Sequence, residues 1–397
     1  MSEKTPASEL KMRMESFCRL MNEQNPDWQM AMIFSKVNLL YFTGSMSEGM
    51  LVVERDKSAV YWVRRSYERA MEESAFEDIR PMSSYRDAAE VYMQKPSVVY
   101  LESEFVPLAM FNRIQKHFLF ETFKGLDFQL SMTRAVKSAW ELSFMEQAGR
   151  IHQHVLEEKV PAILREGMTE ADLAAELYEV AVKEGHQGTA RFAMHDTDLV
   201  VAQLGFGTSS LMPTNFDGPG GNRGLNAAVP SLGSRHRKLK KGDLVFVDMG
   251  VGVNGYHSDK TVTYMFGNSL PDEVIKIHMQ CVEIQNRIAA MLTPGNSGEM
   301  VYETIMDSLS PDFQKNFMGF GNRKVKFLGH GIGITMDEAP VLAKGFKMPF
   351  EENMVFAVEP KKGIEGVGMV GIENTFVVTP QGGRCISGNN PGMILVD

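Results

Sequence analysis

The chain has 397 residues, which is too long for one ordinary hydrophobic core, so we expect two domains. Hydrophobic residues make up 44% and charged residues 23%, as in soluble globular proteins, and the formal net charge is −9. The one marked basic run is Arg235–Lys241, so neither nucleic-acid binding nor a membrane-surface role is expected.

The cysteines and the N-terminus indicate the compartment. Cys18, Cys281 and Cys385 are odd in number and far apart, which argues against a disulfide framework and fits a reducing environment. The first 17 residues are charged throughout and contain no apolar signal core, and no run of 18 apolar residues occurs. The sequence therefore predicts a cytoplasmic protein.

A small α/β domain is predicted for the first part of the chain. Residues 8–24 have a helical stripe of Leu10, Met14, Phe17 and Met21. Strands are expected at the short apolar runs Met30–Phe34, Leu39–Phe42, Gly49–Val53, Ala59–Val63 and Val98–Leu101. Helices are expected at Tyr67–Ser74 and Tyr85–Met93. This alternation indicates a partly parallel sheet, and since its polar residues show no ligand spacing, we expect a scaffold or oligomerisation role.

The pattern changes near residue 132, so we predict domains at 1–132 and 133–397. A long apolar stripe predicts a helix over Trp140–Leu164. Thr169 is placed to cap a second helix, with Asp172 at its third position, and Gly185 is placed to end it.

Residues 186–236 are rich in glycine. Gly205–Gly207 and Gly218–Gly224 indicate loops, and no nucleotide-binding motif is present. Further on, helices are predicted at Asp272–Leu292 and Gly298–Leu309. After the glycine-containing stretch 327–334, strands are predicted at residues 354–360 and 369–378.

The stretch Phe246–Thr261 predicts a β-hairpin. Asn254-Gly255 between two apolar runs is a strong signal for a two-residue turn. In that register Val253 faces Tyr256, Gly250 faces Asp259 and Asp248 faces Thr261. Asp248 and Asp259 then share one face of the hairpin as diagonal neighbours, where they repel each other unless a cation lies between them. Taken alone, the pattern favours a hairpin with two solvated acids.

Three later residues extend this pair. His330 is flanked by two glycines, Glu359 ends an apolar strand, and Glu373 lies inside one. Separately, each has a structural explanation, since a lone histidine is often structural and a strand-end acid is often solvated. Together, four carboxylates and one imidazole predict two divalent cations, and Mn²⁺, Fe²⁺, Co²⁺ and Zn²⁺ all suit such a ligand set.

These residues stand in motifs that resemble the creatinase/prolidase/methionine aminopeptidase superfamily, the M24 "pita-bread" metallopeptidases. The motifs are Val247–Gly250, Gly255–Thr261, Gly329–Gly333, Val358–Pro360 and Gly371–Asn374, with Leu164–Leu173 and Asn38–Gly44 also similar. The spacings of 11 residues from Asp248 to Asp259, 29 from His330 to Glu359 and 14 from Glu359 to Glu373 agree with prolidase-like members.

The resemblance implies an α/β (α+β) fold with a pita-bread catalytic domain after a smaller creatinase-like α/β domain, in a homodimer. It implies that Asp248 and Glu373 bridge two metal ions, that Asp259 binds one ion, and that His330 and Glu359 bind the other. It also implies that Glu359 shuttles protons.

Three positions depart from the prolidase pattern. The histidine expected seven residues after His330 is Asp337, the histidine expected after Pro230 is Ser231, and the arginine expected after Thr261 is Val262. A carboxylate at 337 cannot stabilise an oxyanion unless it is protonated, although it could act as a general base. His236 lies near Ser231 in the sequence, in the basic run.

The sequence therefore predicts a dinuclear metal-dependent hydrolase of small peptides, an Xaa-Pro dipeptidase or aminopeptidase. One alternative keeps the metals but performs non-peptidase chemistry on a small molecule, as a lyase or a hydrolase of non-peptide C–N bonds. Another is a binding protein on a peptidase scaffold, against which the intact ligand set argues.

Overall fold

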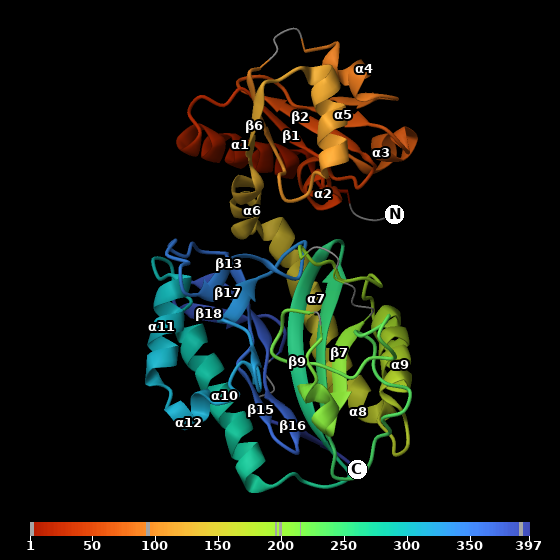
Figure 1. Cartoon of the computed structure of the whole chain (residues 1–397), viewed down its shortest axis with the longest axis vertical. Helices are drawn as coiled ribbons and strands as arrows, with labels where there is room; N and C mark the ends of the chain where they lie inside the picture. Colours follow the sequence, from red (N-terminus) through yellow and green to blue (C-terminus); the bar gives the residue numbers. More distant parts are fainter. Residues whose placement is uncertain (1–3, 93–95, 195–196, 198–200, 215, 389–391) are drawn as a thin grey trace. The chain divides into compact units, whose positions relative to one another are not determined.

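The computed structural model describes the chain apart from residues 1–3, 93–95, 195–196, 198–200, 215 and 389–391. The chain divides into two compact units, Met1–Arg134 and Ala135–Asp397 (Figure 1). Among the helices of the described residues, none is long and apolar enough to cross a membrane.

The first unit is built on a mixed six-stranded sheet. Its strand order is β4-β3-β2-β1-β5-β6, in which β1 pairs antiparallel with β2 and parallel with β5. The strands are β1 Met30–Ile33, β2 Gly49–Glu54, β3 Val60–Val63, β4 Ile79–Pro81, β5 Val98–Leu101 and β6 Thr122–Gly125. The helices are α1 Ala7–Gln24, α2 Lys36–Thr43, α3 Tyr67–Glu73, α4 Tyr85–Ala89, α5 Leu108–Phe118 and α6 Asp127–Ala135, whose last residue lies past the division.

One predicted strand of this unit is wrong. Leu39–Phe42 lies in helix α2, which Ser35 caps at its start and Gly44 ends in a left-handed conformation. Four consecutive apolar residues do not separate a strand from a buried helical turn, and here the flanking cap residues decide for a helix. The helix expected over Tyr85–Met93 is the shorter α4, and residue 93 lies outside the described residues.

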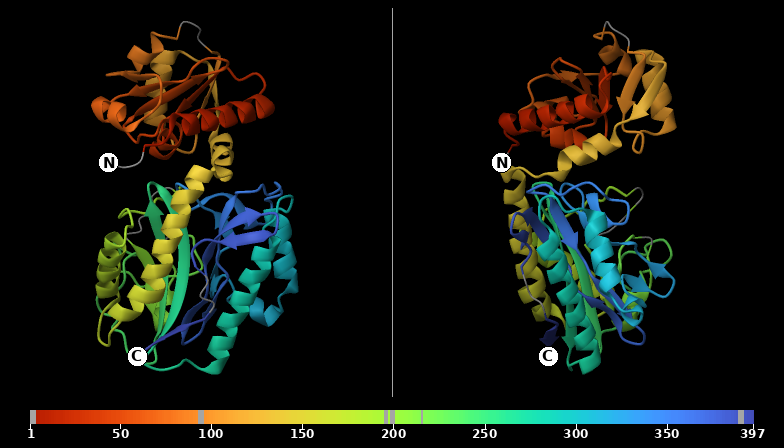
Figure 2. Two further views of the ribbon diagram at one scale, coloured as in Figure 1. Left: turned by 180° about the vertical axis from the view of Figure 1, so that it is seen from behind. Right: turned by 90° about the vertical axis from the view of Figure 1, so that its left-hand side faces the viewer.

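The second unit contains two larger sheets, each covered by helices on its outer face (Figures 1 and 2). The first sheet has the order β19-β9-β8-β7 and the second the order β13-β12-β14-β17-β18. The larger sheets comprise β7 Ala202–Phe206, β8 Leu244–Val253, β9 Tyr256–Phe266, β12 Phe327–Gly331, β13 Glu338–Ala343, β14 Val355–Val358, β17 Asn374–Thr379, β18 Gly382–Cys385 and β19 Ile394–Val396. Two short hairpins pair β10 Gly319–Phe320 with β11 Arg323–Lys324 and β15 Lys361–Ile364 with β16 Gly368–Gly371.

The helices that the sequence predicts for this unit begin at or within one residue of the expected positions. The capping box of Thr169 and Asp172 is formed, and α7 continues through a π-helical turn at Val155–Lys159 into α8. Helices α7 and α9 pack on the first sheet, and α10 and α11 on the second (Figure 1). The helices are α7 Ala139–His154, α8 Val160–Ile163, α9 Glu170–Lys183, α10 Asp272–Met291, α11 Gly298–Ser308 and α12 Pro311–Gln314.

The predicted hairpin is formed by β8 and β9, in the predicted register. Val253 pairs with Tyr256, Gly250 with Asp259 and Asp248 with Thr261. Asn254 and Gly255 both have positive φ angles, of 48° and 93°, as a tight two-residue turn requires.

Strand alternation then decides which side chains enter the site. On β8, Val245, Val247, Met249 and Val251 join the core beneath α7 and α9. Asp248 has the opposite parity and therefore lies on the inner face, toward the second sheet.

The prediction for Gly205–Gly207 is partly wrong, because Gly205 and Phe206 belong to strand β7. A Cβ atom on Gly205 would lie 2.7 Å from the backbone nitrogen of Ser210, so this strand needs glycine where the following turn approaches it. Gly218–Gly224 is a loop, as predicted.

Candidate metal centre

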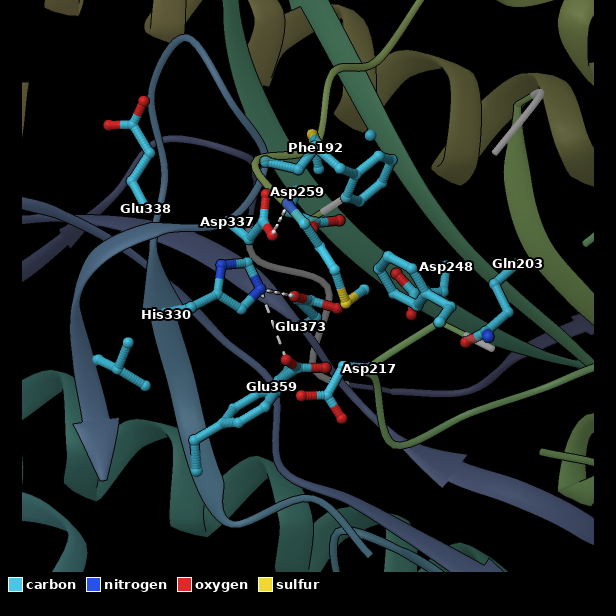
Figure 3. A pocket seen from close by; sticks show the side chains of 16 residues that line it. Phe192, Gln203, Asp217, Asp248, Asp259, His330, Asp337, Glu338, Glu359 and Glu373 are labelled. Atoms are coloured by element: carbon cyan, nitrogen blue, oxygen red, sulfur yellow. Dashed lines mark hydrogen bonds and ion pairs between the residues drawn. The ribbon is translucent and has the colours of Figure 1, made fainter. Parts of the chain in front are cut away.

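The five residues predicted to bind metals line one cavity, of about 310 Å³, between the two larger sheets (Figure 3). Asp248 and Asp259 come from β8 and β9, and His330 from β12. Glu359 directly follows β14, and Glu373 directly precedes β17, which pairs with β14. Antiparallel pairing therefore brings the two glutamates, which are 14 residues apart in sequence, to the same end of the sheet.

The ligand atoms form two groups that share Glu373. One group is Asp259, His330 and Glu373, and the other is Asp248, Glu359 and Glu373, with the atoms of each group within 4.8 Å of one another. His330 Nε2 also lies 3.5 Å from Glu359 Oε1 and 4.0 Å from Glu373 Oε1. The sequence did not predict that His330 would group with Asp259.

The orientation of His330 suits metal binding. Its Nδ1 lies 3.1 Å from the carbonyl oxygen of Gly331, which can only accept a hydrogen bond. Nδ1 therefore carries the proton, and the lone pair of Nε2 points toward Glu359 and Glu373 (Figure 3).

A buried lysine completes the carboxylate cluster. Lys361 Nζ donates hydrogen bonds to Asp248 Oδ2 at 2.9 Å, Glu359 Oε2 at 2.8 Å and Glu373 Oε2 at 2.6 Å. The side chain of Lys361 has no solvent exposure. We did not single out this residue from the sequence. The sequence did contain a signal: Lys361 is two residues after Glu359, and in an extended chain side chains two residues apart lie on the same face.

Burial and like charge dominate the electrostatics of the cluster. Burial raises the pKa of Asp248 to about 6, although Lys361 opposes the shift. Burial, with the charges of Glu373 and Asp248, raises the pKa of Asp259 well above its usual range. For Lys361, burial acts against the ammonium, but the carboxylates of Asp248, Glu359 and Glu373 outweigh it and raise the pKa. The cluster thus holds excess negative charge, which a divalent cation would relieve.

Hydroxyl groups hold the carboxylate-bearing strands in place. Thr261 Oγ1 donates to Glu373 Oε2 at 2.9 Å, and the backbone amide of Asp259 donates to Thr375 Oγ1 at 2.8 Å. Thr375 Oγ1 in turn donates to the carbonyl oxygen of Asp259 at 2.9 Å. These contacts join β9 of the first sheet to β17 of the second and so fix the two halves of the site.

The three positions that depart from the prolidase pattern have different surroundings. Asp337 lines the cavity, and its two carboxylate oxygens accept from the backbone amides of Ala193 at 2.6 Å and Met194 at 3.1 Å. Burial raises the pKa of Asp337. Ser231 is buried away from the residues that line the cavity, Val262 lies in the core under α7, and His236 is exposed.

The walls of the cavity include residues that we did not predict. An apolar surface is formed by Phe192, Met194, Phe216 and Met336. Gln203 on β7 pairs with Asp248 on β8, so the two side chains lie next to each other (Figure 3). Gln203 Nε2 donates to Thr214 Oγ1 at 3.2 Å, whereas its buried Oε1 has no hydrogen-bond partner among the described residues. Gln203 therefore has an unused acceptor beside the cavity.

Residues 143–380, more than half of the chain, match metallopeptidase family M24. The chain belongs to this family. Residues 13–136 match the creatinase/prolidase N-terminal domain, which confirms the predicted two-domain architecture of an M24 protein. Its class is therefore that of the peptidase hydrolases.

Relatives of this M24 protein include dipeptidases. The chain is 25% identical over 380 residues to an Xaa-Pro dipeptidase of Pyrococcus furiosus, a match that spans 94% of this chain and 97% of that one. It is 31% identical over 267 residues to a probable dipeptidase PepE of Mycobacterium tuberculosis, which spans 66% of this chain and 60% of that one.

Solved structures confirm the fold. The prolidase from Pyrococcus horikoshii OT3 superimposes with a TM-score of 0.76 at 21% identity, covering 96% of this chain and 99% of that one. The dipeptidase PepE from Mycobacterium ulcerans superimposes with a TM-score of 0.80 at 22% identity, covering 99% and 100%.

The donor atoms of this M24 centre fit one divalent ion well. Asp259, His330 and Glu373 offer carboxylate oxygens and one imidazole nitrogen, which suit Mn²⁺, Fe²⁺, Co²⁺ or Zn²⁺. The space between Asp248, Glu359 and Glu373 does not fit a second ion, because the Lys361 ammonium already donates to an oxygen of each.

Proposed function

We propose that this chain is a metal-dependent peptidase that hydrolyses short peptides with proline in the second position. The observation that carries the proposal is the group of Asp259, His330 and Glu373, with Glu359 Oε1 3.5 Å from His330 Nε2, on the floor of a cavity in an M24 fold. The names of the relatives, Xaa-Pro dipeptidase and prolidase, support the substrate class.

The residues of the chain have separate roles in this proposal. A divalent ion bound at the cluster supplies Lewis-acid polarisation of the scissile carbonyl and of water. Glu359 takes a proton from the attacking water and delivers it to the leaving proline nitrogen, because its Oε1 faces the cluster while Lys361 holds its Oε2. His330 keeps its Nε2 free for the ion through the bond from Nδ1 to Gly331.

The cavity favours a small substrate with a cationic amino end. Phe192, Phe216 and Met336 offer an apolar wall for a pyrrolidine ring. The open acceptor of Gln203, beside the carboxylate of Asp248, is placed to accept from the substrate α-ammonium.

Asp337 serves as a positioning residue in this account. Its two oxygens hold the amides of Ala193 and Met194, and so fix the segment that carries Phe192 into the cavity (Figure 3). A carboxylate with both oxygens so occupied is poorly placed to act as a general base.

The proposal is tested by assaying a panel of Xaa-Pro dipeptides and longer Xaa-Pro peptides with protein loaded with Mn²⁺ or Co²⁺. We expect release of the N-terminal residue from Ala-Pro or Met-Pro substrates and loss of that release in His330→Ala. A panel in which no peptide is cleaved, by protein with metal bound, would reject the proposal.

Asp337 also supports a second candidate, because an acid stands where prolidases carry a histidine thought to stabilise the tetrahedral species. In that case the same centre acts on a small non-peptide molecule, as a lyase or a hydrolase of a C–N bond. The two candidate functions are distinguished by a parallel screen of small non-peptide amides and of small carboxylic acids with a β leaving group. Turnover of these compounds without cleavage of any peptide favours the second candidate.

Three narrower expectations stay predictions. They are manganese as the physiological metal, a homodimeric assembly and a cytoplasmic location. Metal analysis of the purified protein tests the first, and sedimentation equilibrium tests the second.

A further inference from the structure

We infer that the ammonium group of Lys361 takes the place of one of two metal ions, so that this M24 centre binds a single divalent cation. The inference rests on the proposed metal-dependent function only in assuming that an ion binds. It concerns the number and position of ions rather than the substrate.

The ammonium lies where a cation is needed. Its three contacts go to Asp248 Oδ2, Glu359 Oε2 and Glu373 Oε2, at 2.9, 2.8 and 2.6 Å. An ammonium group has three N–H donors, so all three are used on three different carboxylates. These three carboxylates make up one of the two groups of ligand atoms in the cavity.

The opposite oxygens remain available for one ion. Glu359 Oε1 and Glu373 Oε1 lie 3.5 and 4.0 Å from His330 Nε2, on the side away from the lysine contacts. Asp259 belongs to the same group of ligand atoms as His330 and Glu373. For Glu373, one oxygen therefore serves the ammonium and the other is left for the ion, while the free oxygen of Glu359 lies on the same side.

The formal charges nearly balance in this arrangement. The four carboxylates carry a formal charge of −4, and Lys361 with one divalent ion supplies +3. A second divalent ion at Asp248 would need carboxylate oxygens that already bind the ammonium, and would bring like charges into close contact. Asp248 is thus neutralised by a residue of the chain.

The lysine stem is built into the fold. Lys361 pairs with Gly371 across β15 and β16, and a Cβ atom at Gly371 would lie 2.6 Å from Lys361 Cα and 3.1 Å from its Cγ. Phe246 lies beneath the head group, with its ring centroid 5.8 Å from Nζ. The Lys361 side chain has no exposed surface, so the ammonium cannot swing out into solvent and leave its position to a metal ion.

The test is the number of ions per folded chain. Protein stripped with a chelator is reconstituted with excess Mn²⁺, desalted and analysed by mass spectrometry for metal, with Mn²⁺ electron paramagnetic resonance on the same sample. Wild type should bind one ion per chain and give the six-line spectrum of an isolated ion. Lys361→Ala should bind two ions per chain and give a spin-coupled spectrum.

Lys362→Ala is the matched control. Lys362 is the next residue on the same strand, but its Nζ donates to the carbonyl oxygens of Phe313 and Lys315 rather than to the carboxylates. It should bind one ion, like wild type. Two ions in wild type, or one ion in a folded Lys361→Ala, would overturn the inference; if Lys361→Ala does not fold, the wild-type count and spectrum still decide.

Activity measured on the same samples separates this inference from the proposed function. One ion without cleavage of any Xaa-Pro peptide would reject the proposed function and leave the inference standing. Two coupled ions with cleavage would reject the inference and leave the proposed function standing. Wild type that binds neither Mn²⁺, Co²⁺ nor Zn²⁺ would reject both.

Discussion

Lys361 and Glu373 form the shortest of the three contacts that the buried ammonium makes, with Nζ 2.6 Å from Oε2. Glu373 is also the residue common to both groups of ligand atoms, and Thr261 donates to the same Oε2 at 2.9 Å. Two donors from the chain therefore hold one oxygen of Glu373 and leave the other facing His330. This relationship orients the site.

Thr261→Val should weaken metal binding. The substitution keeps the shape of the side chain but removes the hydroxyl that orients Glu373, and loss of such a partner typically lowers metal affinity about 10- to 100-fold. Isothermal titration with Mn²⁺ measures the change. Thr263→Val is the control, because Thr263 lies on the same face of β9 and donates to the carbonyl oxygen of Gly371 instead. Equal affinities for the two variants would contradict the prediction.

Gln203→Leu should raise KM for a free Xaa-Pro dipeptide by roughly 10- to 100-fold, because a hydrogen bond to a charged group contributes about 1.5–3 kcal/mol. The open Oε1 of Gln203 is the acceptor that the substrate ammonium is proposed to use. The N-acetylated dipeptide is the control substrate. It should bind weakly to wild type and should lose nothing further in Gln203→Leu. An equal loss for both substrates would show that Gln203 only supports the cavity wall.

Asp337→Asn should raise KM for an Xaa-Pro dipeptide about tenfold with a small change in kcat, because it weakens the hydrogen bonds that the side chain accepts from the amides of Ala193 and Met194. The number of metal ions per chain should stay unchanged. Steady-state kinetics separates this from a direct role in proton transfer, which would lower kcat by roughly 10²- to 10⁴-fold. A fall in kcat of that size with KM unchanged would make Asp337 a general base instead.

His186 should make the fold sensitive to acid. Burial lowers the pKa of His186 from 6.5 to about 4, and its Nδ1 accepts from the amide of Gly252 near the tip of the β8–β9 hairpin. Between pH 6.5 and about 4, the imidazole is therefore protonated in the unfolded chain but neutral in the folded chain. This stability is complete above pH 6.5, and falls as the pH drops toward 4.

His186→Gln tests that expectation. Urea denaturation at pH 7 and pH 4 should show wild type losing on the order of 3 kcal/mol more stability than the variant, which has no group to titrate there. Losses of the same size in both proteins would assign the acid sensitivity to other groups.

The part of the site that the sequence predicted best is the β8–β9 hairpin. Its turn residues and its period-two pattern fixed the pairing of Gly250 with Asp259, which the structure confirms. Local patterns were enough because the two strands are joined by a two-residue turn. The five predicted ligands all line one cavity, although His330, Glu359 and Glu373 are far from the hairpin in sequence.

Lys361 and helix α2 show where the sequence was insufficient. The lysine contacts Asp248, which is 113 residues away, and no local pattern encodes a contact of that range. Leu39–Phe42 lies in a helix because Ser35 and Gly44 cap it, a signal outside the apolar run itself. The position of Gln203 in the site could not be predicted, because it follows from the pairing of β7 with β8. A long glycine-rich segment separates these two strands in the chain.

The most direct test of the account is the rate of proline release from Ala-Pro as Mn²⁺ is added to metal-free protein. If one ion at Asp259, His330 and Glu373 supports peptidase activity, the rate should rise in proportion to added metal. It should reach its plateau at one equivalent per chain. A plateau at two equivalents, or no release of proline at any loading, would contradict the account.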